Sequence, residues 1–422
     1  MNNEKRFFRF RTVLLVLIAL LIGYYTGVTK INLEWKNYKP SVSVSSKEPP
    51  PTVSHVDFSS FWTVWQKLEA DYYDKTKLDP RKMLNGAIEG MVRSLGDPFT
   101  TYLPPTQNDN FKEGLAGQFQ GIGAELGLEE NRIIVVAPLN GSPAQKSGIR
   151  AGDTILEVDG EPTFNWSLSQ AVEKIRGPKG SLVTLTILHK GDSKTQEIKI
   201  IRDVITIESV TYWVKKAGEI DGVNVKESKD KKIAYIGLSQ FGDKTNEEWV
   251  GAINKLNLET SGGKDIEGLI LDLRNNPGGY LSDASFISSE FIERGSIVVI
   301  EEEAGGRKTT LSADRKGLFL EVPLIVLINK GSASASEIVA GALRDHERAT
   351  LLGETSFGKG TIQKAEDLGN GAGLHITIAK WLTPQGNWIN EVGLKPDIEV
   401  SIDAKDPSHD VQLEKAILEL IK

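Results

Sequence analysis

The chain has 422 residues, a formal net charge of −7 and no cysteine, with 39% hydrophobic and 25% charged residues. The absence of cysteine excludes disulfides, cysteine metal ligands and a thiol nucleophile. The acidic balance argues against nucleic-acid binding as a main role. A chain of this length predicts two or three domains.

The N-terminus carries a basic segment followed by an apolar one. Four Lys and Arg residues lie within the first eleven positions, and residues 12–29 contain no charged side chain. An apolar run of this length is at the low end of what spans a bilayer, and the basic flank stays in the cytoplasm. Residues 1–29 are therefore predicted to form a cytoplasmic tail and a transmembrane anchor, with the rest exported to the periplasm or cell exterior. A cleaved signal peptide is the alternative.

A linker and a small helical unit are expected next. Residues 30–56 predict a linker without a core, since the stretch 37–56 is rich in Pro, Ser, Val and Lys. The apolar spacing then becomes helical and predicts a helical unit over residues 57–110. Two apolar stripes are expected to form its core. They consist of Phe58, Phe61, Trp62, Trp65 and Leu68, and of Met83, Ala87, Ile88, Met91, Val92 and Leu95.

Residues 111–204 alternate short apolar strands with glycine turns and contain one helix, expected over Leu168–Arg176. The loop Gln120–Leu126 and the hairpin Gly148–Gly160 resemble the carboxylate-binding loop and the central hairpin of a PDZ domain. That resemblance implies that an extended peptide adds as a strand while backbone N–H groups capture its terminal carboxylate. A glycine turn in an ordinary β-rich domain is the alternative. The implied backbone donors are Gly121, Ile122 and Gly123, and the implied apolar pocket consists of Ile122, Leu126, Val172 and Ile175.

Two apolar runs, Gly268–Arg274 and Leu324–Ile328, predict buried parallel strands of an α/β domain over residues 205–422. The first run leads into a diglycine loop, Asn275–Gly279, whose backbone N–H groups can face an oxyanion. A plain tight turn is the alternative for this loop. The loop also resembles the Gly-Asn-Ser-Gly-Gly loop of trypsin-like proteases, but Pro277 stands where the serine would be, which excludes that chemistry.

The second run leads into a serine-rich turn, Ser332–Ser336, and then into helical apolar spacing from Glu337 onward. A serine at a strand-to-helix turn can present its hydroxyl beside backbone N–H groups at the positive end of the helix dipole. A serine nucleophile with an oxyanion hole requires this arrangement. Ser334 and Glu337 also have the spacing of a capping box, which is the structural alternative.

A serine nucleophile needs a positioned base, and Lys359 is the candidate. It lies between Gly358 and Gly360, so the backbone around it can pack closely, and burial would keep its amine neutral. A solvated loop lysine is the alternative. The stretch Gly353–Lys359 has the spacing of a phosphate loop, but Gly360 replaces the hydroxyl residue that binds magnesium, which argues against nucleotide binding. None of the histidines lies in a recognisable catalytic motif, so surface or structural roles are predicted for all five. They are His55, His189, His346, His375 and His409.

Together these segments resemble the C-terminal processing peptidases, a family of serine peptidases with a Ser/Lys dyad. The resemblance covers nearly all of the chain after residue 56. The separation of 25 positions between Ser334 and Lys359 agrees with it. The matching segments occur in the order of the family, and they are Asp272–Gly279, Ser332–Glu337, Phe357–Gln363, Leu382–Gly386 and Gly393–Asp397.

The resemblance assigns roles to individual residues. It implies that Ser334 is the nucleophile, that Lys359 is the general base and that Gln363 orients the lysine. The residues alone do not exclude the two neighbouring serines of the run as nucleophile. The implied oxyanion hole consists of the amides of Ala335 and of Gly278 or Gly279.

The predicted fold is multidomain α/β, with a membrane helix, a helical unit, a PDZ-like β-rich domain and a peptidase core of the crotonase/ClpP-like type. The expected protein is an exported, membrane-anchored endopeptidase that cuts proteins near their C-termini after its PDZ domain binds the free tail. Neither a cofactor nor a metal is expected, and a second copy of the chain or an activating partner stays open. The alternatives are a catalytically silent membrane-tethered scaffold, opposed by the presence of both Ser334 and Lys359, and an acyl-CoA enzyme, opposed by the PDZ segment and the export signal.

Overall fold

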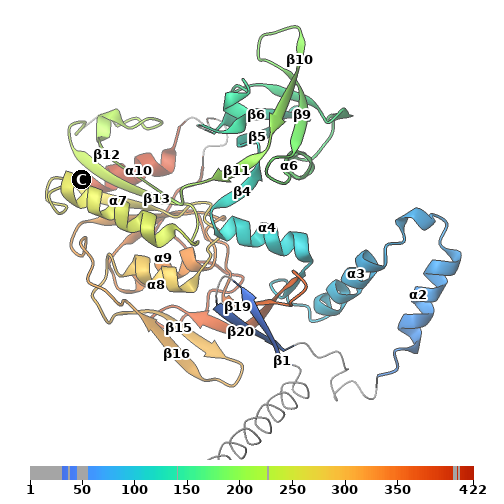
Figure 1. Ribbon diagram of the computed structural model, residues 1–422. Coiled ribbons are helices and arrows are strands. Elements are labelled where there is room, and N and C mark those ends of the chain that lie inside the picture. Colours follow the sequence, from blue (N-terminus) through green and yellow to red (C-terminus); the bar gives the residue numbers. More distant parts are fainter. Residues whose placement is uncertain are drawn as a thin grey trace, which may run out of the picture. The chain divides into compact units, whose positions relative to one another are not determined.

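The computed structural model (Figure 1) describes residues 31–36, 39–44, 56–139, 141–225, 228–402, 406 and 409–422. The predicted membrane anchor falls on residues 1–29 and lies outside this described part. Among the described helices, none is long and apolar enough to cross a membrane. The chain divides into two compact units. The first contains the described residues up to Asp109 together with 363–377, and the second contains 110–362 and 378–422.

The first unit contains the two predicted helices, α2 (Ser59–Asp71) and α3 (Pro80–Arg93). The α3 helix begins after Asp79, whose carboxylate accepts hydrogen bonds from the first backbone N–H groups of the helix. The core-packing prediction is wrong for the first stripe, because α2 has no buried residue and Trp62 is 57% exposed. The apolar period is enough to specify this helix, but no side chain of its apolar face is buried.

The second stripe is only partly buried. Val92 of α3 packs with Tyr102 and Ala372, and Ile88 joins this small cluster from its edge. Met91, in contrast, is 66% exposed. The helical unit therefore has a core at one end of α3 rather than along both stripes.

Short strands complete the first unit. A pair that the linker prediction did not include, β1 (Ile31–Lys36) and β2 (Lys39–Val44), is antiparallel. Alternation of serine and valine over residues 41–44 has the period of a strand. The strand β3 (Thr101–Leu103) pairs with the first residues of β20 (Gly373–Leu382).

The PDZ-like region forms a sheet with the strand order β10-β9-β7-β6-β5, and a second pair joins β4 to β11. The predicted helix is confirmed as α6 (Leu168–Ile175), with Arg176 at its C-terminal cap. The α6 helix begins at a capping box formed by Ser167 and Gln170. The elements are β4 (Gln118–Gly121), β5 (Ala124–Glu129), β6 (Arg132–Pro138), α5 (Pro143–Lys146), β7 (Thr154–Val158), β8 (Glu161–Pro162), β9 (Leu182–Leu188), β10 (Thr195–Ile201) and β11 (Asp203–Thr206).

The peptidase region is built on a sheet with the order β12-β13-β14-β17-β18-β21, in which only β12 runs antiparallel to its neighbour. Both predicted buried strands are confirmed, since every residue of β14 and β17 is buried. The strands are β12 (Val210–Lys216), β13 (Lys232–Leu238), β14 (Gly268–Asp272), β17 (Leu324–Ile328), β18 (Thr350–Gly353) and β21 (Ile398–Glu399).

Helices cover both faces of this sheet (Figure 1). On one face, α7 (Thr245–Glu259), α8 (Leu281–Ser288) and α9 (Ala335–Asp345) pack on alternate strand residues such as Val326. On the other face, α10 (Val411–Leu420) packs on the intervening residues. Covered faces explain why the strands are continuously apolar. A separate hairpin consists of β15 (Ile297–Glu303) and β16 (Lys308–Ser312), and β15 pairs with the end of β20.

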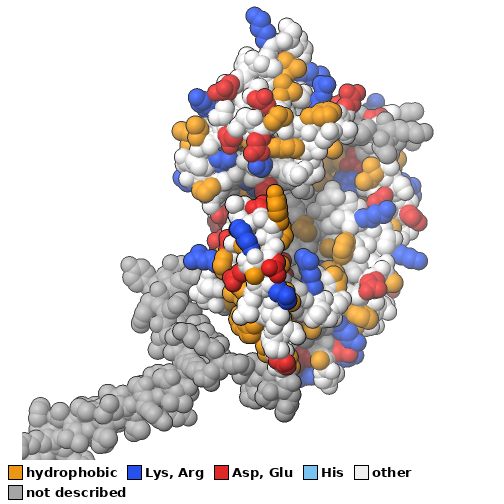
Figure 2. Space-filling model, turned by 90° about the vertical axis from the view of Figure 1, so that its right-hand side faces the viewer, with side chains coloured by type: hydrophobic (Ala, Val, Ile, Leu, Met, Phe, Trp, Pro, Cys, Tyr) orange, Lys and Arg blue, Asp and Glu red, His pale blue; other side chains and the backbone are white. Residues whose placement is uncertain are grey.

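Positive and negative side chains are interspersed on the face drawn in Figure 2 and do not gather into one basic patch. That distribution agrees with the acidic balance of the chain and offers no electrostatic footprint for nucleic acid on this face. Among the described residues, no group of His, Cys, Asp and Glu side chains could hold a metal ion.

Candidate active site

The loops with the predicted catalytic residues leave one edge of the central sheet. Strands β14, β17 and β18 are parallel neighbours, so their carboxyl ends meet at the same edge. The first leads into the diglycine loop, the second into the serine turn before α9, and the third into the turn of Lys359. Open α/β sheets bind their ligands at this edge.

Ser334 differs from the two serines beside it. Its backbone has φ 56° and ψ −116°, a strained conformation for a residue with a side chain, and the residue is half-buried. Ser332 and Ser336 are fully buried. The Ser332 hydroxyl donates to the Leu273 carbonyl at 2.8 Å, and the Ser336 hydroxyl donates to the Asn276 carbonyl at 2.8 Å. Ser336 thus binds the diglycine loop and Ser332 binds the residue before Arg274, so Ser334 is the partly exposed serine of the three.

Glu337 joins the serine turn to the lysine turn. It is fully buried, and one of its oxygens, Oε2, accepts from the Ser334 amide at 2.8 Å and from the Lys359 amide at 2.9 Å. The other oxygen accepts from the Ser356 hydroxyl at 2.6 Å and from the Gly358 amide at 2.7 Å. The backbones of Ser334 and Lys359 therefore contact the same atom. The capping-box spacing predicts the contact between Glu337 and Ser334, but no local pattern in the sequence indicates the contact with Lys359.

The turn around Lys359 is closely packed, as its glycines predict. A Cβ at Gly360 would lie 2.7 Å from Asn390 Cβ, and a Cβ at Gly358, where φ is +89°, would lie 2.9 Å from the Gly393 amide. The Lys359 carbonyl accepts from the Trp381 indole at 2.8 Å. Lys359 itself is half-buried, so its backbone is fixed on both sides while its side chain keeps some access to solvent.

The diglycine loop lies against the serine turn. A Cβ at Gly278 would lie 2.8 Å from Ser334 Cβ and 2.9 Å from the Ala335 amide nitrogen, so only glycine fits there. The Gly278 amide donates to Asn276 Oδ1 at 2.9 Å and is engaged within the loop. No described residue accepts a hydrogen bond from the Gly279 amide. Of the two predicted glycine donors, Gly279 is thus the one not used by the loop.

Gln363 lies in β19 (Thr361–Asp367), the strand that follows the lysine turn. Its side-chain amide donates to Thr377 Oγ1 at 3.1 Å. The lysine turn is thus followed by a strand, whereas a phosphate loop leads into a helix. The orienting role that the resemblance implies for Gln363 stays a prediction.

Ionisable residues beside the diglycine loop have shifted pKa values. Burial, and then the hydrogen bond to Asp243 at 2.8 Å, raise the pKa of Tyr280 to about 12. Burial also raises the pKa of Asp283, in the first turn of α8. At neutral pH Tyr280 therefore stays protonated, and its hydroxyl donates a hydrogen bond to Asp243.

Two of the described histidines contact other residues of the fold. His189 is buried and contacts Asp153 Oδ1 at 2.7 Å, and the His346 ring contacts the Ile297 carbonyl at 2.7 Å. These contacts confirm the predicted structural role for both residues. His55 lies outside the described residues.

The PDZ-like loop has the predicted glycine geometry. Gly123 has φ +74°, and a Cβ there would lie 2.5 Å from Ser142 Cβ. The carbonyls of Ile122 and Gly123 accept hydrogen bonds from the Ala144 and Leu139 amides, whereas no described residue accepts from the amides of Ile122 and Gly123. Gly121 ends β4, directly before this loop.

The predicted pocket residues of the PDZ-like domain come together in part. Ile122 and Ile175 are buried in the domain core, and Leu126 packs on the same cluster from a half-buried position. Val172, one turn before Ile175 on α6, is half-buried. Of the four predicted pocket residues, Leu126 and Val172 are thus the two that keep partial exposure.

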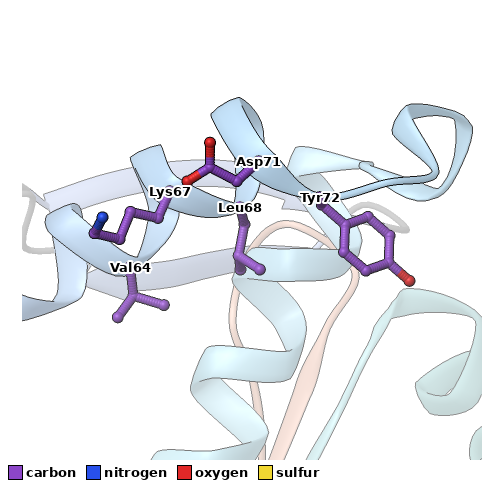
Figure 3. Close-up of a pocket in the computed structure, with 5 residues that line it drawn as sticks. All are labelled: Val64, Lys67, Leu68, Asp71 and Tyr72. Atoms are coloured by element: carbon purple, nitrogen blue, oxygen red, sulfur yellow. The ribbon is translucent and has the colours of Figure 1, made fainter.

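A different pocket lies on α2 (Figure 3). None of the predicted catalytic or peptide-binding residues contributes to it. Its lining residues are Val64, Lys67, Leu68, Asp71 and Tyr72.

An α/β core with a strained serine at a strand-to-helix turn, preceded by a PDZ-like domain, is the architecture of a serine peptidase. Three family descriptions match the chain: Peptidase family S41 over residues 232–400, PDZ domain over 114–188, and Activating protease CtpB N-terminal domain over 17–106.

Named relatives cover most of the chain. It is 37% identical to the carboxy-terminal processing protease CtpA of Bacillus subtilis (strain 168), over 82% of this chain and 69% of the relative. It is 35% identical to CtpB of the same organism, over 90% and 74%. The chain belongs to the carboxy-terminal processing proteases of peptidase family S41, and it is a serine peptidase. A catalytically silent scaffold is therefore not favoured, and an acyl-CoA enzyme is excluded.

Solved structures agree with this assignment. The photosystem II D1 C-terminal processing protease matches with 31% identity and a TM-score of 0.50, over 81% of this chain and 92% of that one. An S41 protease from Bacteroides fragilis matches with 16% identity and a TM-score of 0.56, over 85% and 96%, which supports the fold alone.

Proposed function

We propose that this serine peptidase uses Ser334 as nucleophile and Lys359 as general base, with Gln363 orienting the lysine. The observation that chiefly supports this proposal is the buried Glu337 carboxylate, whose Oε2 binds the amides of both Ser334 and Lys359. The strained, half-buried Ser334 between two fully buried serines supports it as well.

In this mechanism a neutral Lys359 takes the proton of the Ser334 hydroxyl as the oxygen attacks the carbonyl carbon of the scissile peptide bond. The amides of Ala335 and Gly279 stabilise the resulting oxyanion. The peptide C–N bond then breaks, and the leaving amine takes the proton from Lys359. Water next attacks the acyl-enzyme while Lys359 takes its proton, which releases the new carboxylate and returns the proton to Ser334. The reaction needs no cofactor.

Substrates in this proposal are proteins with free C-termini, held by the PDZ domain and cut near the tail. The amides of Ile122 and Gly123, which bind no described residue, support a carboxylate site there. Calorimetry with peptide acids and the matching C-terminal amides tests it. Because a hydrogen bond to a charged group contributes about 1.5–3 kcal/mol, the amide should bind roughly tenfold more weakly or worse. Equal affinities would contradict a carboxylate site.

We further propose that the protein is anchored by residues 1–29 and that its catalytic part faces the periplasm or cell exterior. The basic flank and the uncharged stretch 12–29 support this topology. Protease added to intact cells or spheroplasts should then digest the catalytic part. Digestion only after lysis would refute the export.

The catalytic assignment is tested by Ser334→Ala and Lys359→Ala in the full chain, with Ser332→Ala as the matched loss of one hydroxyl. Both site variants should lose cleavage, and the double variant should be no worse than either one. Ser332→Ala should cleave far faster than Ser334→Ala in its folded fraction, since the Ser332 hydroxyl binds the Leu273 carbonyl and has a structural role. A fluorophosphonate probe mapped by mass spectrometry should modify Ser334. Modification of Ser332, with an active Ser334→Ala, would refute the assignment.

A further inference from the structure

Arg274, in the loop after β14, has an acceptor for every donor of its guanidinium. Nε donates to both oxygens of Asp272 at 3.0 Å. Nη1 donates to Asp410 Oδ1 at 2.9 Å and to Gln412 at 3.1 Å. Nη2 donates to Asp272 at 2.6 Å and to Asp410 Oδ2 at 2.8 Å. A guanidinium has five N–H donors in a fixed plane, so Arg274 is held in one orientation.

Two of these acceptors come from the start of the C-terminal helix, far along the chain. Asp410 is the N-cap of α10, and its carboxylate also accepts from the Leu413 amide at 2.9 Å. Gln412 is fully buried in the first turn. The helix is itself fixed by the sheet, because Leu413 and Ile417 pack in its core. Asp410 therefore connects a rigid helix to the Arg274 loop.

The residues directly after Arg274 reach the serine turn. The Asn275 amide donates to Asn329 Oδ1 at 2.9 Å, in the loop that precedes Ser334. The Asn276 carbonyl accepts from the Ala333 amide at 3.0 Å. Gly278 then lies against Ser334, as described above. Arg274 is thus separated by only a few residues from the part of the loop that lies against Ser334.

We propose that Asp410, at the start of α10, is a positioning residue of the active site, which acts through Arg274 to hold the Asn275–Gly279 loop against Ser334. This inference rests on the proposed roles of Ser334 and of the Gly279 amide. Asp410 does not touch the reacting atoms. Its contribution is the alignment of the oxyanion donor with the nucleophile.

The charges of the cluster determine which variant is informative. Removing Arg274 would leave two partly buried carboxylates without their cation, which destabilises a fold strongly. Asp410→Asn leaves Arg274 paired with Asp272 and keeps a good helix cap, but its –NH₂ cannot accept from the guanidinium. Asp410→Ser also keeps a cap and does not reach Arg274. Leu256→Ala is the matched control, since it removes a fully buried side chain from α7, in the core cluster on the other face of the sheet, without loosening α10 or removing an acceptor of Arg274.

The experiment compares kcat, KM and the rate of fluorophosphonate modification in the full chain, at a temperature where all variants are folded. Both Asp410 variants should lower kcat roughly 10- to 100-fold and slow the modification, with KM unchanged, because a displacement on the ångström scale costs that much. Leu256→Ala should lower the thermal midpoint but keep kcat.

Wild-type kcat in both Asp410 variants, or a rise in KM alone, would overturn the inference. It would also fall if Leu256→Ala lost as much kcat as the Asp410 variants at the same thermal midpoint. Ser334→Ala separates this failure from failure of the proposed function. An inactive Ser334→Ala beside active Asp410 variants would overturn only the positioning role, whereas an active Ser334→Ala would overturn the catalytic assignment.

Discussion

Replacing Glu337 by glutamine tests whether one buried carboxylate holds the two catalytic turns together. Each Glu337 oxygen accepts two hydrogen bonds, and the substitution turns one oxygen into an –NH₂ that faces two donors. Two bonds to a charged acceptor are therefore lost, at about 1.5–3 kcal/mol each. The expected loss in the free energy of unfolding is roughly 3–6 kcal/mol, a large part of the stability of an ordinary domain.

The assay measures urea unfolding and cleavage of a peptide with a free C-terminus under conditions where the variant is folded. We expect kcat to fall roughly 100-fold, since the Ser334 and Lys359 backbones lose their common contact. Glu248→Gln is the matched control, because Glu248 also accepts from backbone amides, at Ser209 and Val210, in a part of the core without predicted catalytic residues. A Glu337→Gln protein with wild-type kcat would refute the reasoning, as would a loss fully explained by its unfolded fraction.

Three further predictions concern single positions. Gly251→Ala in α7 should raise the free energy of unfolding by roughly 0.5–1 kcal/mol, because a Cβ there meets nothing within 4 Å; a lower stability in urea would contradict this. Gly360→Ala should lower the thermal midpoint and the activity, since its Cβ would lie 2.7 Å from Asn390 Cβ; unchanged values would show that the turn adapts. Burial acts to raise the pKa of Asp410, but Arg274 outweighs it and holds this pKa below its ordinary value. The stability gained is present above the ordinary Asp pKa of about 3.9 and is lost as pH falls through the lowered pKa. The difference between wild type and Asp410→Asn should shrink in acid, and a constant difference would contradict it.

Local patterns were sufficient for the elements that carry the site. The continuous apolar run Leu324–Ile328 can only be stable when both faces are covered, and the structure covers both. The small residues around Ser334 and the glycines around Lys359 likewise report on close packing, which the structure contains. These features depend on neighbours in sequence, so they can be predicted from it.

The remaining features depend on residues far apart in the chain. Arg274 and Asp410 are separated by 136 positions, and no periodicity relates them. The same holds for the bond between Glu337 and the Lys359 amide. The core-packing prediction for the first apolar stripe, on α2, is wrong for a different reason. An apolar period specifies one face of a helix but does not determine which residues cover that face.

The capping interpretation and the catalytic interpretation of the serine turn are compatible. A carboxylate that served only the start of α9 would need its bond to the Ser334 amide and would tolerate solvent. Glu337 is instead fully buried and accepts three further hydrogen bonds, all from the segment that contains Lys359. Burying a carboxylate without a cation is costly unless its hydrogen bonds are made, so the Lys359 segment must be in place for Glu337 to be stable there. The hydrogen bonds of Glu337 therefore make the turn after β17 depend on the turn after β18. The capping pattern, which in isolation favours a structural role, thus brings the proposed nucleophile and base together.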